Sequence, residues 1–173
     1  MEPPLLELDA PASSEIGPGL QVWVQRLRGV PPGGTNSSGG MEKMLIPASH
    51  EDLLHSKALA MLATLNADGT PQVTPVWFDY DGTHIVFNTA RGRLKDRNLQ
   101  RNPVVALAIV DPVNAYRYMQ VRGVIDEATE EGANAVIDSL AQKYLGVERY
   151  PFGASGEVRI TYKVRPEKVQ VMG

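Results

Sequence analysis

The sequence contains no cysteine, which excludes disulfides, thiolate metal sites and a cysteine nucleophile. Neither sign of charge dominates, because 17 Lys and Arg stand against 20 Asp and Glu, for a formal net charge of −3. A general nucleic-acid binder carries a basic excess, so nucleic acid is not an expected partner. The chain also lacks an apolar run of about 18 residues and a signal-peptide pattern at its start. We therefore expect a cytoplasmic protein without a membrane partner.

Proline and glycine are unevenly distributed along the 173 residues. Residues 1–40 hold 6 of the 13 prolines and 7 of the 16 glycines. Such a segment buries too little apolar area to offset the entropy that is lost on ordering. It is predicted to be a disordered or loosely attached tail, followed by one domain over residues 41–173. An alternative stays open, in which Met41 or Met44 is the true start.

The domain alternates apolar segments with turn signals. Its first helix is predicted to be capped by Ser49, and its last to begin at Thr129 and end at Gly146. The predicted helices cover residues 49–57, 91–101 and 129–145. The predicted strands cover residues 59–65, 72–80, 83–89, 104–110, 116–128, 157–164 and 168–172. Hairpin-linked strands with so few helices predict a mainly β, antiparallel fold that forms a small closed or half-closed barrel.

Five cations and one anion crowd the segment Arg91–Arg101, a local charge of +4 in a chain of −3. A helix that opens here, after a strand end at Asn88 and Thr89, presents free N–H groups and the positive end of its dipole. Arg93 and Lys95 lie close to this opening, where they could grip a phosphate. A solvated basic helix surface stays an open interpretation, since the sequence has no Gly-rich phosphate loop.

Two strand segments are further candidates for a binding site. Pro75 lacks the N–H that a sheet ladder needs, so its strand is predicted to be an edge strand or to carry a bulge. A free edge can hydrogen-bond a flat heterocycle, and an ordinary amphipathic edge strand is the alternative. Between Asn114 and Gly123 tyrosines and arginines alternate, which suits a pocket rim, a dimer interface or simple packing.

Metal and triad chemistry find little support. The three histidines, His50, His55 and His84, lie in separate segments without the spacing of metal ligands. No Gly-x-Ser-x-Gly elbow marks a nucleophilic serine. No metal site is therefore predicted.

Together these segments resemble a known family. From about His50 to its last residue the chain is similar to the flavin and deazaflavin oxidoreductases of the pyridoxamine 5'-phosphate oxidase-like (PPOX class) FMN-binding split-barrel family. Within that family it most resembles the probable F-420-dependent branch. The similar segments, in the family's order, are residues 59–65, 68–71, 73–78, 88–99, 111–123, 140–146 and 150–152. The last residues, Val169–Gly173, lack the Arg-containing motif of true pyridoxamine-phosphate oxidases, so vitamin B6 oxidation is not expected.

The resemblance implies a six-stranded antiparallel Greek-key split β-barrel with short flanking helices. It also implies a homodimer with two cofactor sites between the subunits. The strand around Trp77 would lie against the ring system, and the segment around Tyr118 would approach from the partner chain. The implied cofactor-binding residues are Thr74, Pro75, Val76, Trp77, Asn88, Thr89, Arg93, Lys95, Asn98 and Tyr118, of which those from Asn88 to Asn98 would hold the phosphate.

The activity that the resemblance implies is hydride transfer between coenzyme F-420, a deazaflavin, and a small electron-poor organic substrate. The Arg-x-Lys-x-x-Asn arrangement formed by Arg93, Lys95 and Asn98 favours F-420, and FMN is the alternative because its relatives have a similar phosphate clamp. Tyr116 and Arg117 are candidate proton donors by position, with a bound water as a further candidate. A non-catalytic flavin or deazaflavin carrier stays open, as does a haem-binding barrel with His84 as ligand.

Overall fold

The structure is a computed structural model that describes residues 46–173. The tail predicted over residues 1–40 and the alternative starts at Met41 and Met44 lie outside the described residues. The helical elements are η1 (Ala48–His50), α2 (Glu51–His55), α3 (Leu94–Arg101) and α4 (Ala133–Leu145). The strands are β1 (Ala60–Leu65), β2 (Pro71–Val76), β3 (Phe78–Tyr80), β4 (Ile85–Ala90), β5 (Val104–Val110), β6 (Tyr118–Thr129) and β7 (Arg159–Met172).

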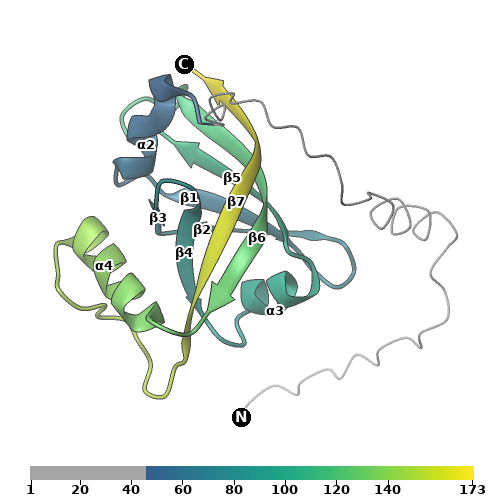
Figure 1. The fold of residues 1–173 in the computed structure, drawn as a ribbon, viewed down its shortest axis with the longest axis vertical. Helices are drawn as coiled ribbons and strands as arrows, with labels where there is room; N and C mark the ends of the chain where they lie inside the picture. The colour runs from purple at the N-terminus through teal and green to yellow at the C-terminus, as the bar shows by residue number, and fades with distance from the viewer. Residues whose placement is uncertain (1–45) are drawn as a thin grey trace, which may run out of the picture. The chain divides into compact units, whose positions relative to one another are not determined.

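All seven strands form one sheet in the order β2-β1-β5-β6-β7-β4-β3, in which every neighbouring pair is antiparallel. The two edge strands, β2 and β3, are consecutive in sequence and joined by Trp77 alone. The sheet must therefore curl until its two edges meet, which gives the half-barrel seen in Figure 1. This confirms the prediction of a mainly β, antiparallel half-closed barrel, and it confirms that the strand with Pro75 is an edge strand.

The six strands that the family resemblance implied are too few, since residues 46–173 form seven. Residues 72–80 were predicted as one strand, and they split at Trp77 into β2 and β3. The split has a physical reason, because β2 pairs with β1 while β3 pairs with β4 at the opposite edge of the sheet. A single continuous strand cannot pair with β1 at one edge and with β4 at the other, so the strand is interrupted at Trp77.

The predicted strands over residues 157–164 and 168–172 are in fact one long strand, β7, which also contains Pro166. Its pairing with β6 shifts register between Arg122 and Gly123, where Gly123 lies opposite Pro166. A Cβ atom at Gly123 would lie 2.4 Å from the backbone oxygen of Arg165, so only glycine fits there. The irregularity absorbs the proline and lets the strand continue.

All three predicted helix starts are wrong, and that of α3 lies at Leu94 instead of Arg91. Ser49 lies inside η1, whose N-cap is Pro47, and its hydroxyl contacts the neighbouring His50 ring instead. Thr129 is the last residue of β6, and the N-cap of α4 is Gly132, whose φ of +69° is left-handed. The predicted end of this helix at Gly146 is confirmed, because Gly146 is its C-cap.

The core fills the inside of the curled sheet. Buried and more exposed side chains alternate along β1 and β5, as expected for strands with one face on the core. The buried leucines of α2, Leu53 and Leu54, belong to the same core. Phe87 of β4 stacks on Tyr162 of β7 with ring centroids 5.4 Å apart. Burial of each such side chain contributes about 1.5–3 kcal/mol.

In the part of the chain that the structure describes, no helix is long and apolar enough to cross a membrane.

Candidate cofactor site

A cavity of about 180 Å³ lies where the β2–β3 junction, the end of β4 and the start of α3 meet. It is lined by Pro75, Val76, Trp77, Asn88, Thr89, Arg93, Lys95, Ile137, Tyr150, Phe152 and Arg159. The fold thus gathers into one cavity two segments that the sequence analysis considered separately, the edge strand with Pro75 and the basic segment. Among the residues implied for cofactor binding, Thr74, Asn98 and Tyr118 do not line it.

The floor of the cavity is a buried polar cluster centred on Asn88. Its side-chain amide donates to the carbonyl of Ala133 over 2.8 Å and to the hydroxyl of Thr161 over 3.1 Å. Its oxygen accepts a hydrogen bond of 2.7 Å from Nε of Arg159. Asn88 therefore uses both ends of its amide to join α4, β4 and β7, and it fixes the direction of the buried Arg159 guanidinium.

Thr89 presents an unsatisfied hydroxyl. The residue is 1% exposed, and its Oγ1 is the one buried side-chain polar atom in residues 46–173 that has no hydrogen-bond partner. Leaving such a group unpaired costs about 1–3 kcal/mol. Thr89 lines the cavity, so a ligand oxygen that reaches this hydroxyl would satisfy it.

Three cations surround the cavity. Arg93, the N-cap of α3, pairs with Glu157 over 3.1 Å, and Arg159 contacts the same carboxylate. Lys95 has no carboxylate within ion-pair distance in the described residues. Burial, and secondarily the charge of Arg93, lower the pKa of Lys95 below its ordinary value. A cation that is partly desolvated and held beside another cation is poised to take an anion.

The start of α3 supports this charge cluster, and no side chain caps it. Gly92 turns the chain with a φ of +77°, and its N–H donates to the carboxylate of Asp96 over 2.8 Å. The same carboxylate accepts a 2.6 Å hydrogen bond from Tyr162 and pairs with Arg91. Free N–H groups at such a helix start add to the field of the cations.

Burial would raise the pKa of Asp96, but several donors outweigh that effect and hold it below its ordinary value. They are the hydroxyl of Tyr162, the N–H of Gly92 and the amide of Gln100, with the charge of Arg91. Asp96 is therefore ionised at neutral pH although it is 1% exposed. Its role is to fix the turn from which Arg93 and Lys95 project.

Aromatic side chains form a further wall of the cavity, to which Trp77, Tyr150 and Phe152 belong. Trp77 stacks on Tyr144 with an interplanar angle of 6°, and it meets Tyr150 edge-on at 5.9 Å. The row continues to Phe152, which is 65% exposed. Tyr144 is held by two backbone contacts, since its hydroxyl donates to Ala58 over 2.7 Å and accepts from the N–H of Phe78. Flat ligands are favoured by such a wall.

Four lining residues were not among the predicted site residues: Ile137, Tyr150, Phe152 and Arg159. Tyr150 and Phe152 belong to one of the segments that carried the family resemblance, so a signal for them existed. Arg159 had no such signal, because it lies at the start of a strand and reaches the cavity only through the pairing of β7 with β4.

Asn98 lies elsewhere in the fold, in a buried amide cluster under α3. Its Nδ2 donates to Thr64 over 3.1 Å and to Asn66 over 3.0 Å, and its oxygen accepts from Arg101. Thr74 is half-buried on β2 opposite Leu62. The Asn98 amide is occupied in joining α3 to β1 and to the turn after it.

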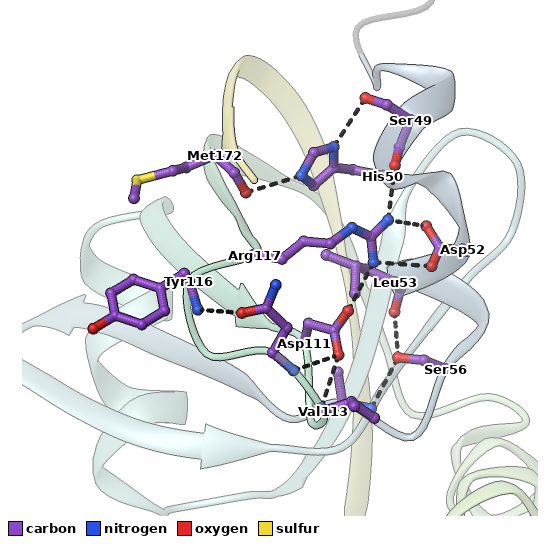
Figure 2. A network of polar contacts seen from close by, with 12 residues as sticks. Ser49, His50, Asp52, Leu53, Ser56, Asp111, Val113, Tyr116, Arg117 and Met172 are labelled. Atoms are coloured by element: carbon purple, nitrogen blue, oxygen red, sulfur yellow. Dashed lines mark hydrogen bonds and ion pairs between the residues drawn. The ribbon is translucent and has the colours of Figure 1, made fainter.

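Tyr116 and Arg117 lie in the β5–β6 turn (Figure 2), and Tyr118 begins β6. None of the three residues lines the cavity. Arg117 is clamped by Asp52 and by Asp111, the latter at 2.9 Å, and it donates to the carbonyl of Ser49 over 2.7 Å. The hydrogen bonds from Arg117 to these two carboxylates raise the pKa of its guanidinium. Tyr116 is 77% exposed, and its ring points away from this cluster.

Two of the three histidines, His50 and His84, form side-chain hydrogen bonds. His84 contacts Asp126 over 3.1 Å at the β3–β4 turn and does not line the cavity. His50 donates from Nε2 to the carbonyl of Met172 over 3.1 Å, which joins η1 to the end of β7 (Figure 2). In residues 46–173 no group of three or more His, Cys, Asp or Glu side chains could hold a metal ion.

A curled antiparallel half-barrel with a cationic, aromatic-walled cavity at the meeting of its sheet edges defines the split-barrel class of cofactor-binding proteins. Within that class, the family profile described as Pyridoxamine 5'-phosphate oxidase matches residues 46–173. The chain belongs to this family. The family assignment makes it a member of an oxidoreductase-type group that is related to flavins and deazaflavins, as the sequence resemblance implied.

Solved structures agree with the assignment. A protein named F-420 reductase is 34% identical over 72% of this chain and 98% of its own, with a TM-score of 0.66. The conserved hypothetical protein Rv2991 from Mycobacterium tuberculosis is 22% identical over 78% of this chain and 89% of its own, with a TM-score of 0.60. HutZ, the heme storage protein from Vibrio cholerae, is 16% identical over 72% of this chain and 93% of its own, with a TM-score of 0.52. The latter two show the fold alone.

A comparison with curated proteins finds no significant match.

Proposed function

We propose that the protein is an oxidoreductase that binds coenzyme F-420 in this cavity and transfers a hydride between it and a small electron-poor organic substrate. The observation that carries the proposal is the unsatisfied Thr89 hydroxyl beside the cations Arg93, Lys95 and Arg159. A phosphate supplies the oxygens and the charge that this group of side chains lacks. The similarity to the F-420 reductase, at 34% identity, supports the choice of deazaflavin.

In the proposed function, the side chains of this protein bind the cofactor and orient it. Arg93, Lys95 and Thr89 would hold the phosphate, and Trp77 would limit the tilt of the ring. The bound deazaflavin supplies the hydride chemistry. The aromatic wall would orient a bound ring and substrate relative to each other and exclude water, which would be the main contribution of the protein.

Proton donation is the least demanding part of the proposed reaction. Arg117 is held by two carboxylates that raise the pKa of its guanidinium, so it is a poor acid. Tyr116 is exposed and free to approach a site on a second subunit. We therefore assign a proton, where the product needs one, to Tyr116 or to bound water.

FMN is the second candidate cofactor, because its phosphate would use the same cations. A haem-binding role is a third, since HutZ shares the fold. His84, its candidate ligand, is bound to Asp126 away from the cavity, which favours the deazaflavin.

The proposal is tested by titrating the purified protein with F-420, FMN, riboflavin and haem while ligand fluorescence or absorbance is followed. We expect F-420 to bind most tightly and riboflavin, which has no phosphate, at least tenfold more weakly than FMN, because charge-assisted bonds contribute about 1.5–3 kcal/mol. Reduced F-420 should then be oxidised in the presence of quinone or nitroaromatic acceptors. Binding of haem alone, with a Soret band, would overturn the proposal.

We also propose that a second copy of the chain completes the site. A cavity of about 180 Å³ is smaller than the roughly 300–1,000 Å³ of ordinary small-molecule sites. The outer face of β2, β1 and β5 carries neighbouring apolar or small side chains that are half-buried or exposed: Val73, Pro75, Met61, Ala63, Ala106 and Ala108. An apolar sheet face next to an open cavity suits a symmetric dimer.

Met61→Glu places a charge at the centre of this face and should convert a dimer into a monomer with weakened F-420 binding. Val113→Glu is the matched control, because Val113 is 94% exposed on the β5–β6 turn. Sedimentation velocity measures the mass of each species. If the unmodified chain sediments as a monomer and still binds F-420, the dimeric site is refuted.

A further inference from the structure

Glu157 does not line the proposed phosphate site, but it pairs with two arginines that do. Its carboxylate pairs with Arg93 over 3.1 Å and with Arg159, and both of these residues line the cavity. The side chain of Glu157 is 14% exposed, so water screens its charge only partly. Each arginine thus contacts this anion and also lines the cavity in which the phosphate would lie.

The carboxylate is ionised at neutral pH. Burial would raise the pKa of Glu157, but the hydrogen bond from Arg159 and the charges of Arg93 and Arg159 hold it below its ordinary value. The site therefore contains a permanent negative charge in addition to its three cations. A guanidinium with a hydrogen bond on either side spans about 6–8 Å, which sets the distance between this charge and a bound phosphate.

We propose that Glu157 is a specificity-determining residue, which makes the site favour a phosphodiester, with one negative charge, over a phosphomonoester, with nearly two. The proposal rests on the proposed function, in which the cavity holds the phosphate of the cofactor. The reason is Coulombic, because repulsion between the carboxylate and the ligand grows in proportion to the charge of the ligand. The phosphate of FMN is a monoester, whereas that of F-420 links two groups as a diester.

Arg159 makes this arrangement stable and difficult to rearrange. It is 7% exposed, its Nε is held by Asn88, and its guanidinium lies 5.0 Å from the centre of the Tyr150 ring. Glu157 is therefore attached to a rigid partner and stays in place when a ligand arrives. Lys95 has no carboxylate partner in residues 46–173. A ligand with a single negative charge can therefore pair with Lys95 without competing with a carboxylate of the protein.

The experiment compares three probes that share one ring: FMN, its phosphate methyl ester and riboflavin. Their phosphate charges at pH 7.5 are nearly −2, −1 and zero. Dissociation constants are measured by flavin fluorescence for the unmodified full chain, Glu157→Gln and Glu157→Asp. Glu148→Gln is the matched control, because Glu148 is exposed in the connection after α4 and forms no ion pair in the described residues.

We expect Glu157→Gln to strengthen the binding of FMN more than that of the methyl ester. Their affinity ratio should shift roughly 30- to 100-fold toward FMN, as one unit charge at about 6–8 Å gives with an effective dielectric constant of about 20. Riboflavin should be unaffected. Glu157→Asp, which keeps the charge, and Glu148→Gln should leave the ratio unchanged. Gln retains acceptors for Arg159, and thermal unfolding confirms that each variant is folded.

The outcomes separate the two claims. If FMN and its ester bind no better than riboflavin, the phosphate site itself is refuted and the proposed function with it. If both bind better than riboflavin and Glu157→Gln leaves their ratio unchanged, the role of Glu157 is refuted while the phosphate site stands.

Discussion

Lys95→Ala should weaken binding of F-420 or FMN about 10- to 150-fold, or roughly 1.5–3 kcal/mol, the range for charge-assisted hydrogen bonds. Lys95 lines the cavity, lies in the first turn of α3 and has no carboxylate partner in the described residues. Its loss therefore removes a ligand contact without breaking an internal ion pair. The fold should keep its stability, because burial of an unpaired ammonium is itself unfavourable.

The measurement is a fluorescence titration of the variant beside Lys168→Ala, which removes a lysine on the exposed end of β7. Lys95→Arg should recover part of the affinity, because it restores the charge with a different shape. Riboflavin, which has no phosphate, should bind the variant and the parent equally. An equal loss for riboflavin and FMN would show that Lys95 supports the ring or the fold and does not grip a phosphate.

Local sequence signals were sufficient for the parts of the site that lie within one segment. Pro75 could be assigned to an edge strand because it lacks an N–H, and the edge position is confirmed. The helix after Asn88 could be predicted from charge and spacing, although it begins at Leu94 and not at Arg91. Each of these inferences needs only the neighbours of a residue in sequence.

The rest of the site depends on pairings between distant segments. Arg159 reaches the cavity because β7 pairs with β4 in a register that places it opposite Ala90. Asn98 looks like a phosphate ligand in the sequence, yet its amide is taken by Thr64 and Asn66. No local pattern reports which partner a side chain will find across the sheet. The split at Trp77 had the same origin, since it follows from closure of the sheet.

The turn that positions the cations depends on one buried carboxylate, and Asp96→Ala should lower the free energy of unfolding by about 3–5 kcal/mol, the cost of removing one partner from a buried charged network. Four groups would lose their acceptor: the N–H of Gly92, the hydroxyl of Tyr162, the amide of Gln100 and the guanidinium of Arg91. Because the Tyr162 side chain is buried, its hydroxyl could not replace the lost hydrogen bond with one to solvent.

Asp96→Asn tests the charge separately from the shape. The pKa of Asp96 is depressed in the folded state, so its contribution to stability is complete above the unfolded pKa of about 3.9 and is lost as the pH falls through the folded value. The parent should therefore lose stability in acid, and the difference between parent and Asp96→Asn should shrink as the pH falls from 7 to 3. Urea unfolding at both pH values measures it, with the exposed Glu131→Gln as control.

Asp96 also links stability to binding, because Arg93 and Lys95 project from the turn that it holds. In buffer at pH 7 without urea, where Asp96→Asn remains folded, the variant should bind FMN more weakly than the parent does. Its loss of affinity for riboflavin should be smaller. A variant that loses stability but keeps the phosphate preference of the parent would show that the cations need no support from this turn. A variant that loses both stability and the phosphate preference would show that the buried carboxylate supports the binding site as well as the fold.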